Sequence, residues 1–185
     1  MRSWIRRTWL SVGFLLALLG AGTARALVIV QAVGPSSPIA VGASFQIDLV
    51  ADLGDPILGW GLDLVFDPAV IAPSGAPTIG PGWAAAFAPD GDGLAGLAFP
   101  NGITGSGILL ASQTFTAIAP GTSAVDLAVT PGDLTEGFAL DPTGFAAPSF
   151  LGASVDVPEP GGALLLALAA AAAGLARRSR LHVRP

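Results

Sequence analysis

Residues 58–66 read LGWGLDLVF and are followed directly by Asp67-Pro68. Large apolar side chains fall at every second position of this stretch, and the positions between them are mostly small or polar. Because successive side chains of a strand point to opposite faces of its sheet, this alternation predicts a β-strand with one buried face. Aspartate followed by proline is typical of a turn, so we expect the strand to end at Phe66.

Similar short apolar segments recur along the middle of the chain, between turn signals rich in Gly, Pro and Asp. Many short strands at regular spacing predict an all-β domain, and we expect an antiparallel β-sandwich. The other expected strands are 27–32, 45–51, 84–87, 94–99, 108–117, 124–129, 138–140 and 153–157. The expected turns are 34–35, 54–56, 67–68, 90–93, 119–121 and 131–133.

The order of these segments resembles a cohesin-like domain. Residues 41–49 are similar to its early strand, and residues 58–71 to its strand that ends in an aromatic-Asp-Pro turn. Residues 108–117, followed by 120–123, are similar to its late strand and turn. The resemblance spans 27–157 and implies a jelly-roll type sandwich of about nine strands. Cohesins bind dockerin modules in cellulose-degrading complexes, but no binding-face residue is matched here, so that partner is not transferred.

The N-terminus has the features of an export signal. Three arginines lie within the first seven residues, and residues 10–19 form an uncharged apolar segment. Ala24 and Ala26 form a small-x-small cleavage site. This order predicts a signal peptide over 1–26, so the mature chain is expected to begin at Leu27.

The C-terminus combines a short polar motif, an apolar segment and a basic tail. Pro158-Glu159-Pro160 precedes the uncharged residues 161–176. A helix that is apolar all round is buried either in protein or in lipid. A small domain has little room to surround one, so we favour a single transmembrane helix over an Ala-rich core helix. Arginines stay preferentially on the cytoplasmic side, so the tail 177–185 is expected there; its basic cluster is Arg177, Arg178 and Arg180.

This three-part order, from 158 to 185, resembles the PEP-CTERM sorting signal of Gram-negative bacteria, also labelled an ice-binding-protein C-terminal region. The resemblance implies recognition by an exosortase, an integral-membrane processing enzyme that cuts near the Pro-Glu-Pro motif. It also implies a place in the cell envelope, at the cell surface or in the extracellular matrix, in association with exopolysaccharide or biofilm. The two prolines themselves hold Glu159 in an extended, accessible segment.

The charge of the predicted ectodomain, 27–157, excludes several functions. It contains eleven Asp, one Glu and no Lys, Arg or His, for a formal charge of about −12. Nucleic-acid binding is excluded because it needs cations against phosphate. Histidine- and lysine-dependent catalysis is excluded as well, and the chain has no Cys for thiol chemistry. Carboxylate chemistry and oxygen-ligated cations, chiefly Ca²⁺, remain open.

Three groups of residues are candidate ligand sites. Asp90 and Asp92, in the sequence Asp-Gly-Asp-Gly, either offer carboxylates to Ca²⁺ or form a hairpin turn, and we favour the turn. Trp83 follows Gly-Pro-Gly and is expected to be an exposed stacking platform, whereas Trp60 is expected in the core. A second acidic group comprises Asp52, Asp55, Asp63 and Asp67, whose mutual geometry the sequence leaves open.

These observations favour an exported, non-enzymatic surface or extracellular-matrix protein, sorted by an exosortase and needing no cofactor. The alternative is a cohesin-like binding module for a protein partner or polysaccharide, tethered by an uncleaved C-terminal helix. A third hypothesis, a glycosidase-type hydrolase, requires two carboxylates in a cleft. No motif points to such a pair, so we expect no enzyme.

Overall fold

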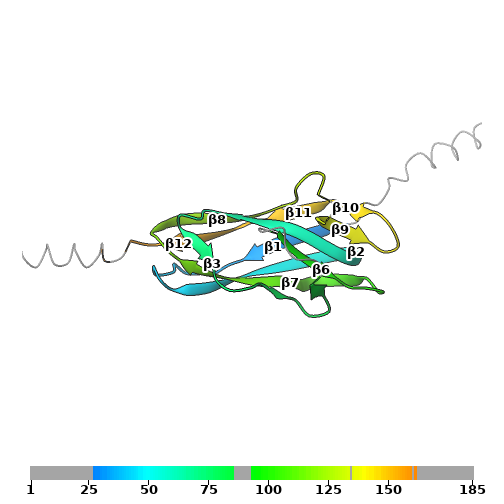
Figure 1. Cartoon of the computed structure of the whole chain (residues 1–185), viewed down its shortest axis with the longest axis horizontal. Helices are drawn as coiled ribbons and strands as arrows, with labels where there is room; N and C mark the ends of the chain where they lie inside the picture. The colour runs from blue at the N-terminus through cyan, green and yellow to red at the C-terminus, as the bar shows by residue number, and fades with distance from the viewer. Residues whose placement is uncertain (1–26, 86–92, 134, 160, 162–185) are drawn as a thin grey trace, which may run out of the picture.

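Twelve β-strands make up the part of the chain that the computed structural model describes, residues 27–85, 93–133, 135–159 and 161 (Figure 1). This confirms the predicted all-β class. No helix that could cross a membrane occurs among these residues. The predicted signal peptide lies outside them, and so does the predicted C-terminal helix apart from Gly161. The strands are β1 Val28–Val33, β2 Ser44–Phe66, β3 Ile71–Pro73, β4 Thr78–Ile79, β5 Ala84–Ala85, β6 Gly93–Leu97, β7 Ile103–Ala117, β8 Gly121–Ala128, β9 Gly137–Leu140, β10 Phe145–Ala146, β11 Pro148–Leu151 and β12 Ala153–Val157.

Strand β2 is long and takes part in both layers of the sandwich. Its first half pairs with β1 and β7, whereas residues 57–66 pair with β6 on one side and with β8 and β9 on the other. Shifts in its register with β7 mark bulges between Ala51 and Ile57, where a strand can bend without ending. The turn predicted at 54–56 is therefore wrong, because the bulges accommodate Gly54 and Pro56 within a continuous strand.

The first layer has the order β11, β1, first half of β2, β7, with β3 and β4 beside β7. The second layer has the order β5, β6, second half of β2, then β8 and β9, with β12 beside β8 and β10 beside β9. Every pair is antiparallel except β1 with β11, which is parallel and departs from the prediction. Strand β11 was not predicted, because its burial is only partial and does not separate a core face from a solvent face.

The core lies between the two layers. Phe115 of β7 is fully buried and contacts the ring of Phe45 at a centroid distance of 5.9 Å and that of Phe66 at 5.1 Å. Apolar residues of both layers continue this core from Val28 in the first strand to Val157 in the last. Because all twelve strands and this core lie within 28–157, the segment has what a domain needs to fold by itself.

The turn after β2 forms as the sequence predicts. The carboxylate of Asp67 accepts a hydrogen bond of 2.9 Å from the backbone N–H of Ala69, and its carbonyl accepts from Val70 and Ile71 at 3.1 Å. The N–H of Asp67 donates to the hydroxyl of Ser123 at 3.0 Å, which ties the turn to β8. Asp67 is therefore used by its own turn.

Candidate functional site

The outer face of the second layer carries a row of residues that runs across four strands. In register, Leu97 of β6 lies beside Gly59 of β2, Gly59 beside Ala139 of β9, and Ala139 beside Phe145 of β10. The two middle positions have no side chain or only a methyl group, while the two outer side chains are 42% and 64% exposed. Small residues flanked by large ones leave a groove between the large ones.

A hollow of about 130 Å³ lies along this row, and we call it the groove. The neighbouring positions that line it are also small, namely Ala95, Gly96 and Gly137. Its lining further includes Trp60, Thr135 and Glu136. The groove is therefore an apolar channel that a single carboxyl group adjoins.

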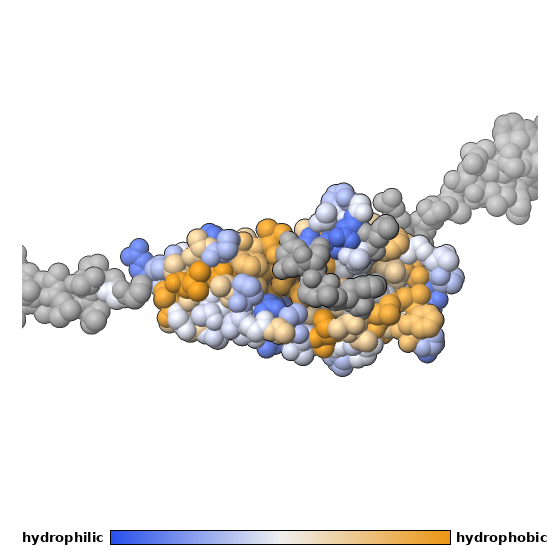
Figure 2. Space-filling view, in the orientation of Figure 1, coloured by the Kyte–Doolittle hydropathy of each residue, from blue (hydrophilic) through white to orange (hydrophobic). Residues whose placement is uncertain are grey.

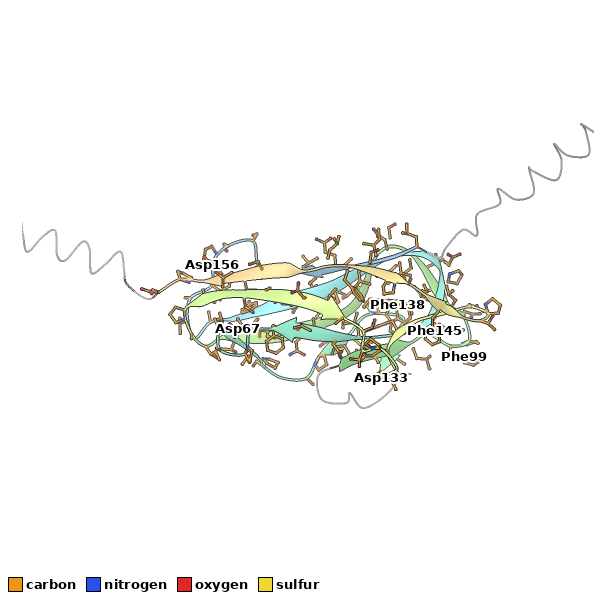
Figure 3. All side chains as sticks on the ribbon, turned by 90° about the horizontal axis from the view of Figure 1, so that it is seen from above. Asp67, Phe99, Asp133, Phe138, Phe145 and Asp156 are labelled. Atoms are coloured by element: carbon orange, nitrogen blue, oxygen red, sulfur yellow. The ribbon has the colours of Figure 1, made fainter. Side chains whose placement is uncertain are left out.

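A second, wider hollow of about 460 Å³ shares Leu97 with the groove and is lined by residues 82–84, 97–101 and 103. Phe99, which lines it, is 77% exposed. Figure 3 shows Phe99 and Phe145 close to the same end of the domain. In Figure 2, apolar residues are exposed on the face turned to the viewer toward the end where β9 and β10 lie. We call the three exposed side chains Leu97, Phe99 and Phe145 the apolar strip.

Trp83 does not form the exposed platform that we expected. It is only 7% exposed, and its ring packs edge-on against that of Trp60 at 6.2 Å. The preceding Gly80 comes so close to β7 that an added Cβ would lie 2.0 Å from the carbonyl oxygen of Leu109. This close approach turns Trp83 into the core, and only part of it reaches the wider hollow. Trp60 is 3% exposed, which confirms its predicted place in the core.

Two acidic residues are buried together: Asp63 on the outer face of β2 and Glu136 in the lining of the groove. Asp63 and Glu136 are each 9% exposed. The hydroxyl of Thr130 donates to Asp63 Oδ2 at 3.0 Å, and the backbone N–H of Thr130 donates to Glu136 Oε2. One threonine therefore holds both carboxyl groups, which we call the acid pair. Burial, and then the charge of Asp63, raises the pKa of Glu136.

The loop between β8 and β9 covers this acid pair. It begins with a turn in which the N–H of Asp133 donates to the carbonyl of Thr130 at 3.1 Å, with Gly132 at φ +94°. A positive φ at this position, after a proline, is typical of a type II turn and agrees with the predicted turn at 131–133. Asp133 accepts bonds of 2.7 Å from the N–H and hydroxyl of Thr135, and these lower the pKa of Asp133.

Gly61 allows this loop to rest directly on β2. A Cβ added to Gly61 would lie 2.1 Å from the carbonyl oxygen of Thr135 and 3.0 Å from Cα of Glu136. Only glycine leaves room for such an approach of two backbones. The contact at Gly61, two residues before Asp63 in β2, therefore fixes the backbone that carries Glu136 next to Asp63.

The candidate calcium ligands from the sequence are not tested by the structure. Asp90 and Asp92 lie outside the described residues. Within the described ranges, no three or more potential metal-ligating side chains lie together. Of the second acidic group, Asp52 accepts a bond of 2.8 Å from the N–H of Gly107 and Asp67 caps its own turn, whereas Asp63 lies beside Glu136. Sequence reasoning did not single out Glu136, because the two acids are far apart in the chain.

The comparisons with known proteins are informative only at the level of structure. No protein-family model matches the chain, and no curated protein matches it. A non-cellulosomal cohesin from the archaeon Archaeoglobus fulgidus matches with a TM-score of 0.55 and 16% identity, over 76% of this chain and 96% of that one. A type II cohesin from the cellulosome of Acetivibrio cellulolyticus matches with a TM-score of 0.54 and 14% identity, over 70% and 95%.

Cohesins solved together with partners match to a similar degree. The third ScaB cohesin of R. flavefaciens, solved with a group 1 dockerin, has a TM-score of 0.53 and 10% identity, over 75% of this chain and all 100% of that chain. Identities this low establish a shared fold and nothing finer. The predicted cohesin-like sandwich is confirmed as a fold: the described strands are arranged as in cohesin domains.

Proposed function

We propose that residues 27–157 form an exported, non-enzymatic module that binds a protein partner through the apolar strip and the groove. The observation that carries this proposal is the row Leu97, Gly59, Ala139 and Phe145, which leaves a groove between exposed apolar walls. Contiguous exposed apolar surface on a folded domain marks interaction sites. The shared fold supports the proposal, since several matching cohesins were solved in complex with dockerins.

The partner's chemistry follows from size and charge. A volume of about 130 Å³ lies well below the roughly 300–1,000 Å³ of small-molecule pockets, so the groove suits one anchoring side chain. Residues 27–157 carry twelve acidic side chains and no basic one. Complementary charge steers association and favours partners of opposite sign. The partner is therefore a protein segment with an aromatic or aliphatic anchor and flanking Lys or Arg residues.

The test is peptide display on the isolated segment 27–159. We expect the selected peptides to combine one large apolar residue with basic residues, and to bind in calorimetry. Phe145→Ser and Leu97→Ser should each weaken that binding at least about tenfold, because each removes one wall of the groove. Leu151→Ser is the matched control, since Leu151 is 51% exposed but lies on β11 in the first layer.

Two results contradict the proposal. One is equal binding by wild type and both groove variants, which would move the contact surface elsewhere. The other is selection of peptides with no excess of basic residues, which would remove the electrostatic argument.

We further propose that the C-terminal signal sorts this module to the cell envelope. Pro158-Glu159-Pro160, the apolar segment and the terminal arginines support recognition by an exosortase, with release among matrix exopolysaccharide. The intact mass of the protein from envelope and medium tests this. A C-terminus near 158–161 supports sorting with cleavage. A mass that retains the arginine tail, in the membrane fraction, contradicts it and leaves the tethered binding module.

A further inference from the structure

The acid pair has an unusual charge environment. Asp63 and Glu136 are both at least nine-tenths buried, and Asp133 of the same loop adds a third negative charge nearby. The ectodomain sequence supplies no Lys, Arg or His that could neutralise them. Burying a carboxylate is costly unless an opposite charge or hydrogen bonds compensate for the lost water.

The hydrogen bonds of the pair are incomplete. Thr130 supplies one donor to each carboxyl group, through Asp63 Oδ2 and Glu136 Oε2. The other two oxygens, Asp63 Oδ1 and Glu136 Oε1, are buried and receive no hydrogen bond from a neighbouring N–H or hydroxyl group. Each of these two buried oxygens is therefore an acceptor that lacks a positively charged partner. The two carboxyl groups lie close enough to share a proton, and this competes with any ion at the pair.

We propose that Asp63 Oδ1 and Glu136 Oε1 are ligands of a hard divalent cation such as Ca²⁺. Calcium takes oxygen ligands, including carboxylates and several waters, in a flexible geometry. Of Asp63 and Glu136, only Glu136 lines the groove, so an ion would approach from that side and keep its remaining waters there. The seating of the loop on Gly61 holds the two carboxyl groups together in advance of binding.

This site differs from the calcium ligands considered from the sequence, Asp90 and Asp92. It also predicts a link between metal and loop. A cation that joins β2 to the residue before β9 clamps the loop between β8 and β9 onto the sheet. An ion that binds only the folded state raises the free energy of unfolding. Once the free ion concentration exceeds the Kd, this rise follows the logarithm of the concentration.

The experiment uses segment 27–159, which holds every described strand and the whole described core. Chelator-treated protein is titrated with CaCl₂ in calorimetry and in thermal unfolding, against NaCl at equal ionic strength. We expect a saturable heat and a rise in Tm with CaCl₂ only. Asp63→Asn and Glu136→Gln should each weaken Ca²⁺ affinity at least about tenfold. Both variants keep an oxygen acceptor for Thr130, and circular dichroism checks that they are folded.

The matched control is Asp156→Asn, which removes the same charge from an exposed residue at the other end of the domain (Figure 3). It should bind Ca²⁺ as wild type does. Calcium binding that survives both acid-pair variants overturns the proposal and places the ion elsewhere. Absence of any Ca²⁺ effect, with Glu136→Gln raising the Tm of the metal-free protein at neutral pH, also overturns it and assigns a shared proton to the pair.

Discussion

Substituting Gly61 by alanine should detach the loop that covers the acid pair. The new Cβ would meet the carbonyl oxygen of Thr135 at 2.1 Å, and the obstacle is backbone, which cannot swing aside as a flexible side chain can. The loop must therefore lift from β2. The φ angle of Gly61 is not positive, so alanine can adopt the same backbone conformation without strain. The effect of the substitution is therefore the steric contact with the backbone of the loop.

The loss of stability can be estimated from the contacts that the loop makes. Lifting it removes the donation of Thr130 to Glu136 and to Asp63, and hydrogen bonds to charged groups are worth about 1.5–3 kcal/mol each. The two carboxyl groups regain water when the loop lifts, which offsets part of this loss. We therefore expect Gly61→Ala to lower the free energy of unfolding by about 2–4 kcal/mol.

Gly59→Ala is the matched control, two residues away on the same face of the same strand. Its Cβ would meet Leu97 Cδ1 at 3.3 Å and the carbonyl oxygen of Gly96 at 3.4 Å, so a small shift is enough. Glycine costs a strand roughly 0.5–1 kcal/mol relative to alanine, and this gain offsets the crowding. Urea unfolding, extrapolated linearly, measures both variants. Equal stability of the two variants would refute the backbone contact at Gly61.

Three further predictions follow from particular contacts. Phe115→Ala should lose about 3–5 kcal/mol in urea unfolding because it leaves a cavity beside two other rings, whereas the exposed Phe99→Ala should stay within about 0.5 kcal/mol. Burial raises the pKa of Glu136 above its ordinary 4.5, so the folded metal-free protein holds that proton more tightly than the unfolded chain. The free energy of unfolding of the metal-free protein should therefore fall as the pH rises past 4.5. The charge that faces Glu136 is that of Asp63. Glu136→Gln should flatten this part of the pH profile in urea unfolding. Gly80→Ala, whose Cβ would lie 2.0 Å from the carbonyl oxygen of Leu109, should expose Trp83 and shift its fluorescence to the red.

The alternation of residues 58–66 was enough to predict the strand, its buried face and its end at Asp67-Pro68. It was not enough to show that the strand continues from Ser44. Gly54 and Pro56 are typical of turns in a sequence, and whether they reverse the chain or bulge a strand depends on partners elsewhere. Here β7 pairs on both sides of the irregularity, at Ala51 and at Ile57, and this keeps the strand continuous.

The candidate site was harder to predict, because its residues meet only through strand register. The groove needs Leu97, Gly59, Ala139 and Phe145 from four strands in one row. The acid pair needs Asp63 in β2 and Glu136 in a loop, and no local pattern joins them. The error at Trp83 has the same origin. A Gly-Pro-Gly segment suggests an exposed loop, but the packing of Gly80 against β7 turns the next tryptophan inward.

Two of the three glycines of β2, Gly59 and Gly61, show how one strand serves stability on one face and the proposed binding on the other. Trp60 and Leu62 face the core, and their alternation is what identifies the strand. Gly59 precedes Trp60 and Gly61 follows it, so both lie on the outer face, where a strand normally gains from side chains. Gly59 opens the groove, and Gly61 admits the loop that carries Glu136 to Asp63. A larger residue at either position would close one of the two candidate sites, so the positions that look weakest for a strand are the ones on which the proposed binding depends.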